Sequence, residues 1–400
     1  MSHATKYFQQ AFPKYDDLNE SVQENVSAIR VVKAYVREEQ ETSKLRRASE
    51  NIYNIFVKAE TNLVFNAPMM QTTVYTCILL VSWFGAKMIA SNSLTTGELM
   101  SLLTYCMNIL MSLMMLSMVF VMITMSMASA KRISEVLNET SDLKNPEHPF
   151  MKVEDGSIEF RHVDFAYKKD SDEPVLEDID LKIRSGETIG IIGGTGSGKS
   201  TLVSLIPRFY DPQEGTVKVN GINAKDYPQG ELCSEIGVVQ QRSILFKGSI
   251  RDNLKWGNDQ ASDEDLWKAI TIAQAKDVVE AKPGKLDFEV EQNGRNLSGG
   301  QKQRLTIARA LVSKPEILIL DDSLSALDFA TDAALRKAIG ELEGNVTTFL
   351  VSQRISGIRQ ADKILVMEDG ELAGQGTHEE LLKEGGFYSH LYNSQFQAVS

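Results

Sequence analysis

The chain has 400 residues, with 54 Asp and Glu against 42 Lys and Arg and a formal net charge of -12. Its length predicts two or more domains. The acidic balance argues against a general nucleic-acid binder, for which clustered basic surface is expected. Three cysteines at 77, 106 and 233 form neither a paired framework nor a metal-binding spacing, which suits a reducing compartment.

Residues 15–60 contain few helix breakers and many helix formers. Apolar side chains recur there at three- and four-residue spacings, for example at Val22, Val26 and Ile29. The pattern predicts one long helix that is polar enough to stand in water and that continues into the apolar run after it.

Two stretches without a charged side chain come next, at 64–86 and 99–130. As helices they would be about 35 and about 48 Å long, against about 30 Å for the hydrocarbon core of a bilayer. We therefore predict two membrane spans, at about 64–90 and 99–125, with the Met-rich end of the second projecting into the cytoplasm. Two core helices of a large soluble protein are the alternative interpretation.

Basic residues flank these spans on one side only. Six precede the first span and two come after the second, namely Lys33, Arg37, Lys44, Arg46, Arg47, Lys58, Lys131 and Arg132. The connector at 91–98 has none. The positive-inside rule then places both ends of the chain in the cytoplasm. Because residues 1–17 contain no apolar signal core, insertion is expected to depend on the spans themselves.

The pattern changes after the second span. Residues 138–152, with Pro146 and Pro149, are expected to form a linker. From 153 onward, short β-rich runs alternate with helical stretches, which predicts an α/β unit with a partly parallel sheet. The expected organisation is therefore a membrane part at 1–137, a linker at 138–152 and an α/β domain at 153–400.

A phosphate-binding motif lies directly after one of these β-rich runs. Residues 193–201, GGTGSGKST, match the G-x-x-x-x-G-K-[ST] pattern between an apolar run and a helical one. Glycines let the backbone amides turn toward phosphate oxygens. Lys199 would reach the β- and γ-phosphates of ATP, and Ser200 would ligate Mg²⁺. The other residues expected to contact the phosphates are Gly193, Gly194, Thr195, Gly196, Ser197, Gly198 and Thr201. A glycine-rich turn without a ligand is the alternative.

The run ILILDDSLSALD, at 317–328, combines four aliphatic residues with two adjacent aspartates. It predicts a buried strand beside the phosphate loop, with Asp321 at its end in the magnesium shell. The predicted cofactors are therefore ATP and Mg²⁺.

A further motif is LSGGQ at 297–301, which precedes KQRLTIARAL and then the aspartate strand. In combination with the phosphate motif, it resembles the signature of ATP-binding cassette (ABC) proteins. Residues 15–137 resemble the last part of an exporter-type transmembrane domain, and residues 26–41 resemble its second intracellular coupling helix and the start of the next helix. The resemblance implies a helical membrane part and a nucleotide-binding domain with an antiparallel β-subdomain near 157–185 and a helical subdomain near 245–312.

The resemblance also assigns roles to individual residues. Tyr167 matches the aromatic that stacks on adenine, although an exposed aromatic before a loop is the alternative. Gln241 matches the glutamine that touches Mg²⁺ and the attacking water. The signature residues Ser298, Gly299, Gly300 and Gln301 would bind the γ-phosphate of ATP held by a second cassette, and Asp328 would close the loop between the two sites.

Two positions depart from the family pattern. Asp322 stands where the family usually has the glutamate that polarises water, and Gln353 where it usually has a histidine near the γ-phosphate. Aspartate is one methylene shorter, and glutamine cannot carry a positive charge. We expect ATP binding to survive while hydrolysis weakens, although an adequate Asp322 is the alternative. His378 lies in a different segment and is expected to be structural.

The resemblance implies an exporter subunit in a bacterial cytoplasmic membrane, paired with a second half-transporter. A heterodimer is favoured and a homodimer is possible, with the lipid bilayer and a small-molecule or lipid-like substrate as further partners and no nucleic acid. Family members use six spans per half, so either Met1 is an internal start or the chain is a truncated fragment with four spans upstream. The alternatives are a soluble cassette ATPase, a membrane regulator without transport and a non-functional truncated half-transporter.

Overall fold

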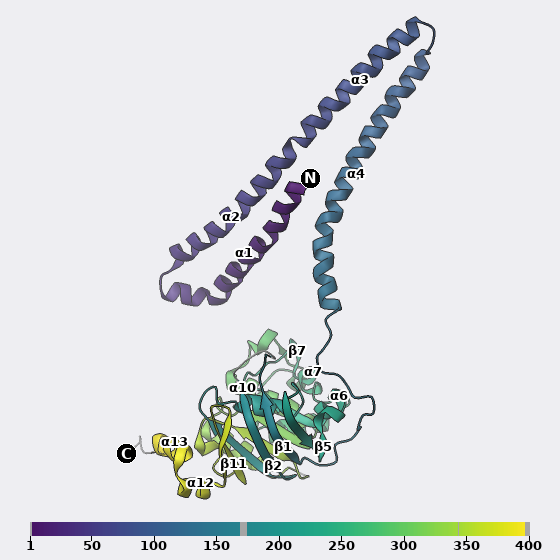
Figure 1. Cartoon of the computed structure of the whole chain (residues 1–400). Helices are drawn as coiled ribbons and strands as arrows, with labels where there is room; N and C mark the ends of the chain where they lie inside the picture. Colours follow the sequence, from purple (N-terminus) through teal and green to yellow (C-terminus); the bar gives the residue numbers. More distant parts are fainter. Residues whose placement is uncertain (1, 169–173, 343, 397–400) are drawn as a thin grey trace. The chain divides into compact units, whose positions relative to one another are not determined.

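The computed structural model describes residues 2–168, 174–342 and 344–396. The chain divides into two compact units, residues 1–140 and residues 141–400. The first unit is helical and the second is an α/β unit (Figure 1).

The described part of the first unit begins with an antiparallel helix pair, α1 (Ser2–Ala34) and α2 (Glu38–Val64). The prediction of one continuous helix over 15–60 is therefore wrong. The chain reverses at Val36, whose φ of 53° lies in the left-handed region, and the Arg37 amide donates to the Val32 carbonyl at 3.0 Å. Because the turn contains neither Gly nor Pro, the sequence gives no sign of it.

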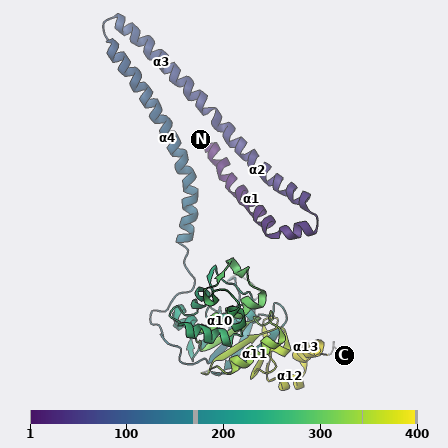
Figure 2. The same cartoon turned by 180° about the vertical axis from the view of Figure 1, so that it is seen from behind.

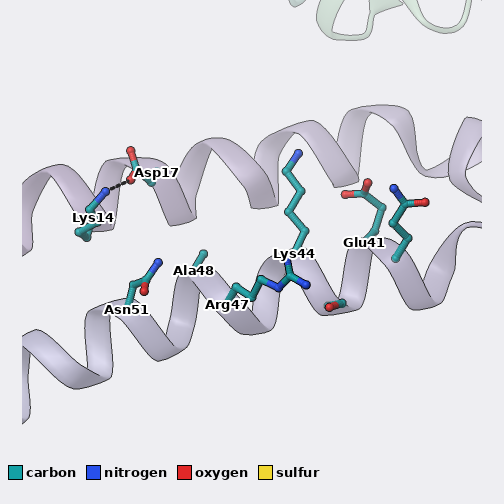
Figure 3. Close-up of a pocket in the computed structure, with 9 residues that line it drawn as sticks. Lys14, Asp17, Glu41, Lys44, Arg47, Ala48 and Asn51 are labelled. Carbon is teal, nitrogen blue, oxygen red and sulfur yellow. Dashed lines mark hydrogen bonds and ion pairs between the residues drawn. The ribbon is translucent and has the colours of Figure 1, made fainter.

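Polar contacts join the two helices across the turn. The Lys44 ammonium lies 2.7 Å from the Glu24 carboxylate, and the Asn25 amide donates to Glu41 at 3.1 Å. Figure 3 shows a polar groove of about 570 Å³ farther along the same pair, with Lys14 and Asp17 on α1. These contacts stabilise the hairpin without a large apolar interface.

Two apolar helices come next, α3 (Asn66–Ala90) and α4 (Thr96–Leu137). Segments Pro68–Ala90 and Thr96–Phe120 are long and apolar enough to cross a membrane. Thr95 and Glu98 form a capping box that starts α4. At 42 residues, α4 is about 63 Å long, so it extends well beyond the thickness of a hydrocarbon core.

The described part of the second unit is built on a six-stranded sheet in the order β12-β11-β3-β10-β9-β6. Every neighbouring pair is parallel except β11–β12, as expected for a partly parallel sheet. The strands are β3 (Thr188–Gly193), β6 (Ile236–Val239), β9 (Ile317–Asp321), β10 (Thr347–Val351), β11 (Lys363–Glu368) and β12 (Glu371–Gly376). The central strands are buried aliphatic runs because the sheet is covered on both faces.

A second sheet is antiparallel, in the order β2-β1-β4-β5. Its strands are β1 (Ile158–Phe165), β2 (Leu176–Ile183), β4 (Glu214–Val219) and β5 (Ile222–Asn223). The expected β-subdomain near 157–185 covers only β1 and β2, since β4 and β5 join them from after the phosphate loop. A short pair, β7 (Gly248–Ser249) and β8 (Glu289–Val290), lies elsewhere.

Helices complete the unit, and α7 to α10 fall where the helical subdomain near 245–312 is expected. The α-helices are α5 (Lys199–Leu205), α6 (Gln229–Ser234), α7 (Ile250–Lys255), α8 (Asp263–Ile272), α9 (Lys276–Glu280), α10 (Gly299–Val312), α11 (Phe329–Gly340), α12 (His378–Glu384) and α13 (Gly386–Phe396). Leu266 and Ile270 of α8 are fully buried in one core with Leu305 of α10. Figure 2 shows α12 and α13 together near the C-terminus.

Two glycines of the antiparallel sheet allow a matched test of its packing. Gly215 and Gly221 have similar φ angles, 76° and 71°. A Cβ at Gly215 would collide with the His162 carbonyl, whereas one at Gly221 would meet no described atom within 4 Å. We expect Gly221→Ala to cost about 1 kcal/mol from φ alone and Gly215→Ala about 3 kcal/mol, measured by thermal unfolding of the full chain. Equal losses would contradict this packing.

Candidate functional site

The candidate site lies at the carboxyl edge of the six-stranded sheet. Strand β10 lies between β3 and β9, and Val351 pairs with both Ile191 and Asp321. The aspartate strand is therefore not a direct neighbour of β3, although both end at the same edge. Ligands bind at this edge in open parallel sheets because the loops after the strands converge there.

The phosphate loop joins β3 to α5 and is shaped by its glycines. Gly198 has a φ of 90°, and a Cβ there would lie 2.7 Å from a methyl carbon of Leu176. A Cβ at Gly194 or Gly196 would meet no described atom within 4 Å. Gly194, Thr195 and Gly196 are exposed, so this part of the loop is open to a ligand.

The Lys199 side chain is buried inside the loop. Its ammonium group donates to the Gly193 carbonyl at 3.0 Å, to the Gly194 carbonyl and to the Ser197 hydroxyl at 3.2 Å. Burial lowers its pKa, while the Asp321 and Asp322 charges oppose that shift. The loop therefore holds a cation where backbone amides and a helix N-terminus can also meet an anion.

Ser200 and Asp321 come together as predicted. The Ser200 hydroxyl donates to the Asp321 carboxylate at 3.0 Å. Oxygen ligands at about 2.1 Å from an octahedral Mg²⁺ ion lie about 3 Å apart, so this pair fits two neighbouring ligands of such an ion. Burial, and then the adjacent Asp322 charge, raise the pKa of Asp321 against the opposing Ser200 hydrogen bond.

Gln241 and Asp322 form the second pair at this edge. The Gln241 amide donates to the Asp322 carboxylate at 3.1 Å. Asp322 has a φ of 43°, and burial raises its pKa while Gln241, Lys199 and Arg354 lower it. The carboxylate is therefore held in one direction by an amide rather than left free to turn.

Gln353 lies in the loop after β10 at the same edge. Its residue is exposed, and its main-chain carbonyl accepts a hydrogen bond from the Gln395 amide at 2.8 Å. His378 lies elsewhere, where its Nδ1 contacts the Tyr388 hydroxyl at 2.8 Å in the C-terminal helices. This position agrees with the structural role expected for His378.

Tyr167 is placed beside the phosphate loop by the antiparallel sheet. Its hydroxyl lies 3.0 Å from the Thr201 hydroxyl, and its ring packs edge-on against Tyr210 with centroids 5.2 Å apart. The residue is 55% exposed. An exposed aromatic surface next to a phosphate site can stack on a base.

The signature residues form a separate group at the start of α10. Ser298 caps this helix in a capping box with Gln301, and Gly299 is exposed. A Cβ at Gly300 would lie 3.3 Å from the Ala326 carbonyl, so this group adjoins the loop after β9. At the end of that loop, Asp328 caps α11 by accepting from the Thr331 amide at 3.0 Å, which lowers the pKa of Asp328.

Three contacts at the site were not predicted. Tyr210 packs against Tyr167, Gln303 accepts from the Ser243 hydroxyl, and Gln395 binds the loop of Gln353. Gln303 lies two residues after LSGGQ, which is a weak signal in the sequence. Gln395 is 42 residues from Gln353, and no sequence pattern connects them.

Comparisons with known proteins agree with this geometry. Residues 176–325 match the model of the ABC transporter family, and residues 1–114 match that of the ABC transporter transmembrane region. The chain is 39% identical over 389 residues to the uncharacterized ABC transporter ATP-binding protein YfiB of Bacillus subtilis, covering 97% of this chain and 67% of that protein. The chain belongs to the ABC transporter family.

Two further similarities specify the exporter type. An ATP-dependent lipid A-core flippase of Desulfotalea psychrophila is 35% identical over 380 residues, covering 95% of this chain and 66% of that protein. The solved structure of a bacterial Atm1-family ABC exporter with ATP bound superposes with a TM-score of 0.89 at 29% identity, covering 99% of this chain and 70% of the other. The chain thus spans about two thirds of these proteins.

This ABC exporter chain therefore combines a transmembrane region with a cytoplasmic ATP-binding domain. The match to the transmembrane region excludes the soluble cassette ATPase considered from the sequence. Its ATPase domain couples ATP hydrolysis to transport, and exporters of this type act as dimers in the lipid bilayer.

The paired aspartates predict a conflict between stability and Mg²⁺ binding. Because burial raises the pKa of Asp321 above its unfolded value, its ionised form costs stability at neutral pH, and this cost disappears as pH falls through the raised pKa. We expect Asp321→Asn to melt at a higher temperature than wild type without ligand. We also expect it to lose the stabilisation by MgATP, which is about 2.7 kcal/mol at 100 times Kd. Thermal melts at neutral pH with and without MgATP test this, and a variant that melts lower without ligand would contradict it.

Proposed function

We propose that this chain is one half of a heterodimeric ABC exporter and that its own site binds MgATP but hydrolyses it slowly. The observation that carries the proposal is the geometry of Asp322, whose short carboxylate is held by Gln241 at 3.1 Å. The neutral Gln353 on the neighbouring loop adds a second change of the same kind.

The binding residues support retention of ATP. Tyr167 would stack on adenine, and residues 193–201 would hold the phosphates through their amides and Lys199. Ser200, Asp321 and Gln241 would hold Mg²⁺, which when bound neutralises phosphate charge. We assign these roles to a nucleotide-binding domain at 153–400, joined by a linker at 138–152 to the membrane part at 1–137.

The catalytic positions favour slow hydrolysis. Aspartate places its oxygens roughly 1 Å farther from a water than glutamate does, and a misplacement of that size can cost about a hundredfold. Burial raises the pKa of Asp322 and so disfavours the charged form that would polarise water. Gln353 can donate a hydrogen bond to a γ-phosphate but cannot place a cation there.

The intact signature favours an asymmetric pair. Ser298 to Gln301 keep the whole motif at the start of α10, where they would contact ATP held by a partner cassette. A partner with glutamate and histidine at the two altered positions would then supply a competent site. In a homodimer both sites would carry Asp322 and Gln353.

The substrate class is proposed from the relatives alone. One is named as a lipid A-core flippase and another, of Bacillus subtilis, as a probable multidrug resistance transporter. We therefore propose an amphipathic, lipid-like or drug-like substrate. Nine methionines between 100 and 127 would offer an adaptable apolar surface, although packing against other helices or lipid explains them equally well.

Mutations on the two sides of the interface test the asymmetry. In the purified heterodimer, changing the partner's glutamate to glutamine is expected to remove nearly all ATPase activity, and Asp322→Asn much less. Conversely, Asp322→Glu with Gln353→His is expected to raise turnover at this site about tenfold or more, because it restores both the reach and the cation.

A binding control accompanies these assays. Lys199→Ala is expected to weaken ATP binding by this chain, which distinguishes loss of binding from loss of hydrolysis. Equal losses from Asp322→Asn and from the partner's change would overturn the asymmetric assignment. Purification of an active homodimer would replace it with a symmetric one.

A further inference from the structure

The loop at 352–357 carries Gln353 and starts at the nucleotide edge of the sheet. The Ser352 amide donates to the Ile191 carbonyl of β3 at 3.0 Å, and the Ser352 hydroxyl accepts from the Arg354 amide at 3.0 Å. Ile355 is fully buried and opens a short 3₁₀ turn. The loop is therefore fixed at both ends, with Gln353 and Arg354 exposed between them.

A side chain from the last helix binds this loop on both sides of Arg354. The Gln395 carbonyl oxygen accepts from the Ile355 amide at 3.0 Å, and the Gln395 amide donates to the Gln353 carbonyl at 2.8 Å. One amide group thus satisfies a donor and an acceptor of the loop backbone, as a neighbouring strand would. A rotation of the main chain at Gln353 would break at least one of these bonds.

Helix α13, which carries Gln395, is itself anchored. Tyr388 is 2% exposed, and its hydroxyl lies 2.8 Å from Nδ1 of His378 in α12. Burial raises the pKa of Tyr388 to about 12, so the hydroxyl keeps its proton at neutral pH. The rings of His378 and Tyr392 also pack together, with centroids 5.6 Å apart. Gln395 therefore extends from a packed base.

We propose that Gln395 is a positioning residue for the nucleotide site. By holding the backbone at Gln353 and Ile355, it sets the direction in which the Gln353 side chain meets the γ-phosphate. This inference rests on the role of Gln353 in the proposed function, but it does not require that hydrolysis be slow. It makes the C-terminal helix part of the machinery that distinguishes ATP from ADP.

The main test replaces Gln395 with methionine in the full chain, assembled with its partner in nanodiscs. Methionine has a similar length and makes neither hydrogen bond. We expect amide exchange over 352–357 to become about five- to thirtyfold faster, since two hydrogen bonds are lost. The preference for a non-hydrolysable ATP analogue over ADP is expected to fall by about fivefold, with ADP affinity unchanged, because one γ-phosphate contact is lost.

Two matched variants separate positioning from a general loss of structure. Tyr388→Phe removes the hydrogen bond to His378 but touches nothing in the loop, so it is expected to lower the melting temperature and leave the ATP preference intact. In a Gln353→Ala background, Gln395→Met is expected to leave the ATP preference unchanged, since there is no side chain left to position.

Several results would overturn the proposal. They are unchanged amide exchange in Gln395→Met, an unchanged ATP preference, or an equal fall in preference with and without the Gln353 side chain. None of these measurements involves hydrolysis. Slow turnover at Asp322 could therefore prove wrong while the role of Gln395 stands, and the reverse outcome is equally visible.

Discussion

Parallel pairing of β3, β10 and β9 is the constraint on which the nucleotide site depends. Val351 is in register with Ile191 on one side and with Asp321 on the other. The three strands therefore end together, and the phosphate loop, the aspartate pair and the Gln353 loop leave the sheet at one edge. The buried aliphatic residues of these strands fix the register because a slip of one residue would turn them out of the core.

This edge concentrates charge in a partly buried place. Asp321 and Asp322 are adjacent, and burial raises the pKa of both. Lys199 lies close enough to lower each of them, while its own pKa is lowered by burial. The sheet thus holds two carboxylates and one ammonium group in a setting that disfavours all three charges. Such an arrangement is costly to the fold and useful for binding a charged nucleotide with a metal ion.

The sequence was informative where a local pattern carries the chemistry. The motif at 193–201 and the aspartates after a buried strand predicted a phosphate loop, and the Ser200–Asp321 contact places both in one site. The reversal at Val36 escaped prediction because a β-branched residue rarely adopts a left-handed φ. Strands β4 and β5 and the Gln395 contact could not be predicted, because each joins segments that are distant along the chain.

Two contacts connect the residues that would bind this chain's own ATP to the signature that would face a partner's. Ser243, two residues after Gln241, donates to the buried side chain of Gln303 in α10. Gly300 approaches the Ala326 carbonyl in the loop after Asp322. The position of the signature helix is therefore coupled to the loops around the magnesium ligands. Because binding alone would order these loops, a site that holds ATP and hydrolyses it slowly can still present an intact signature to a partner.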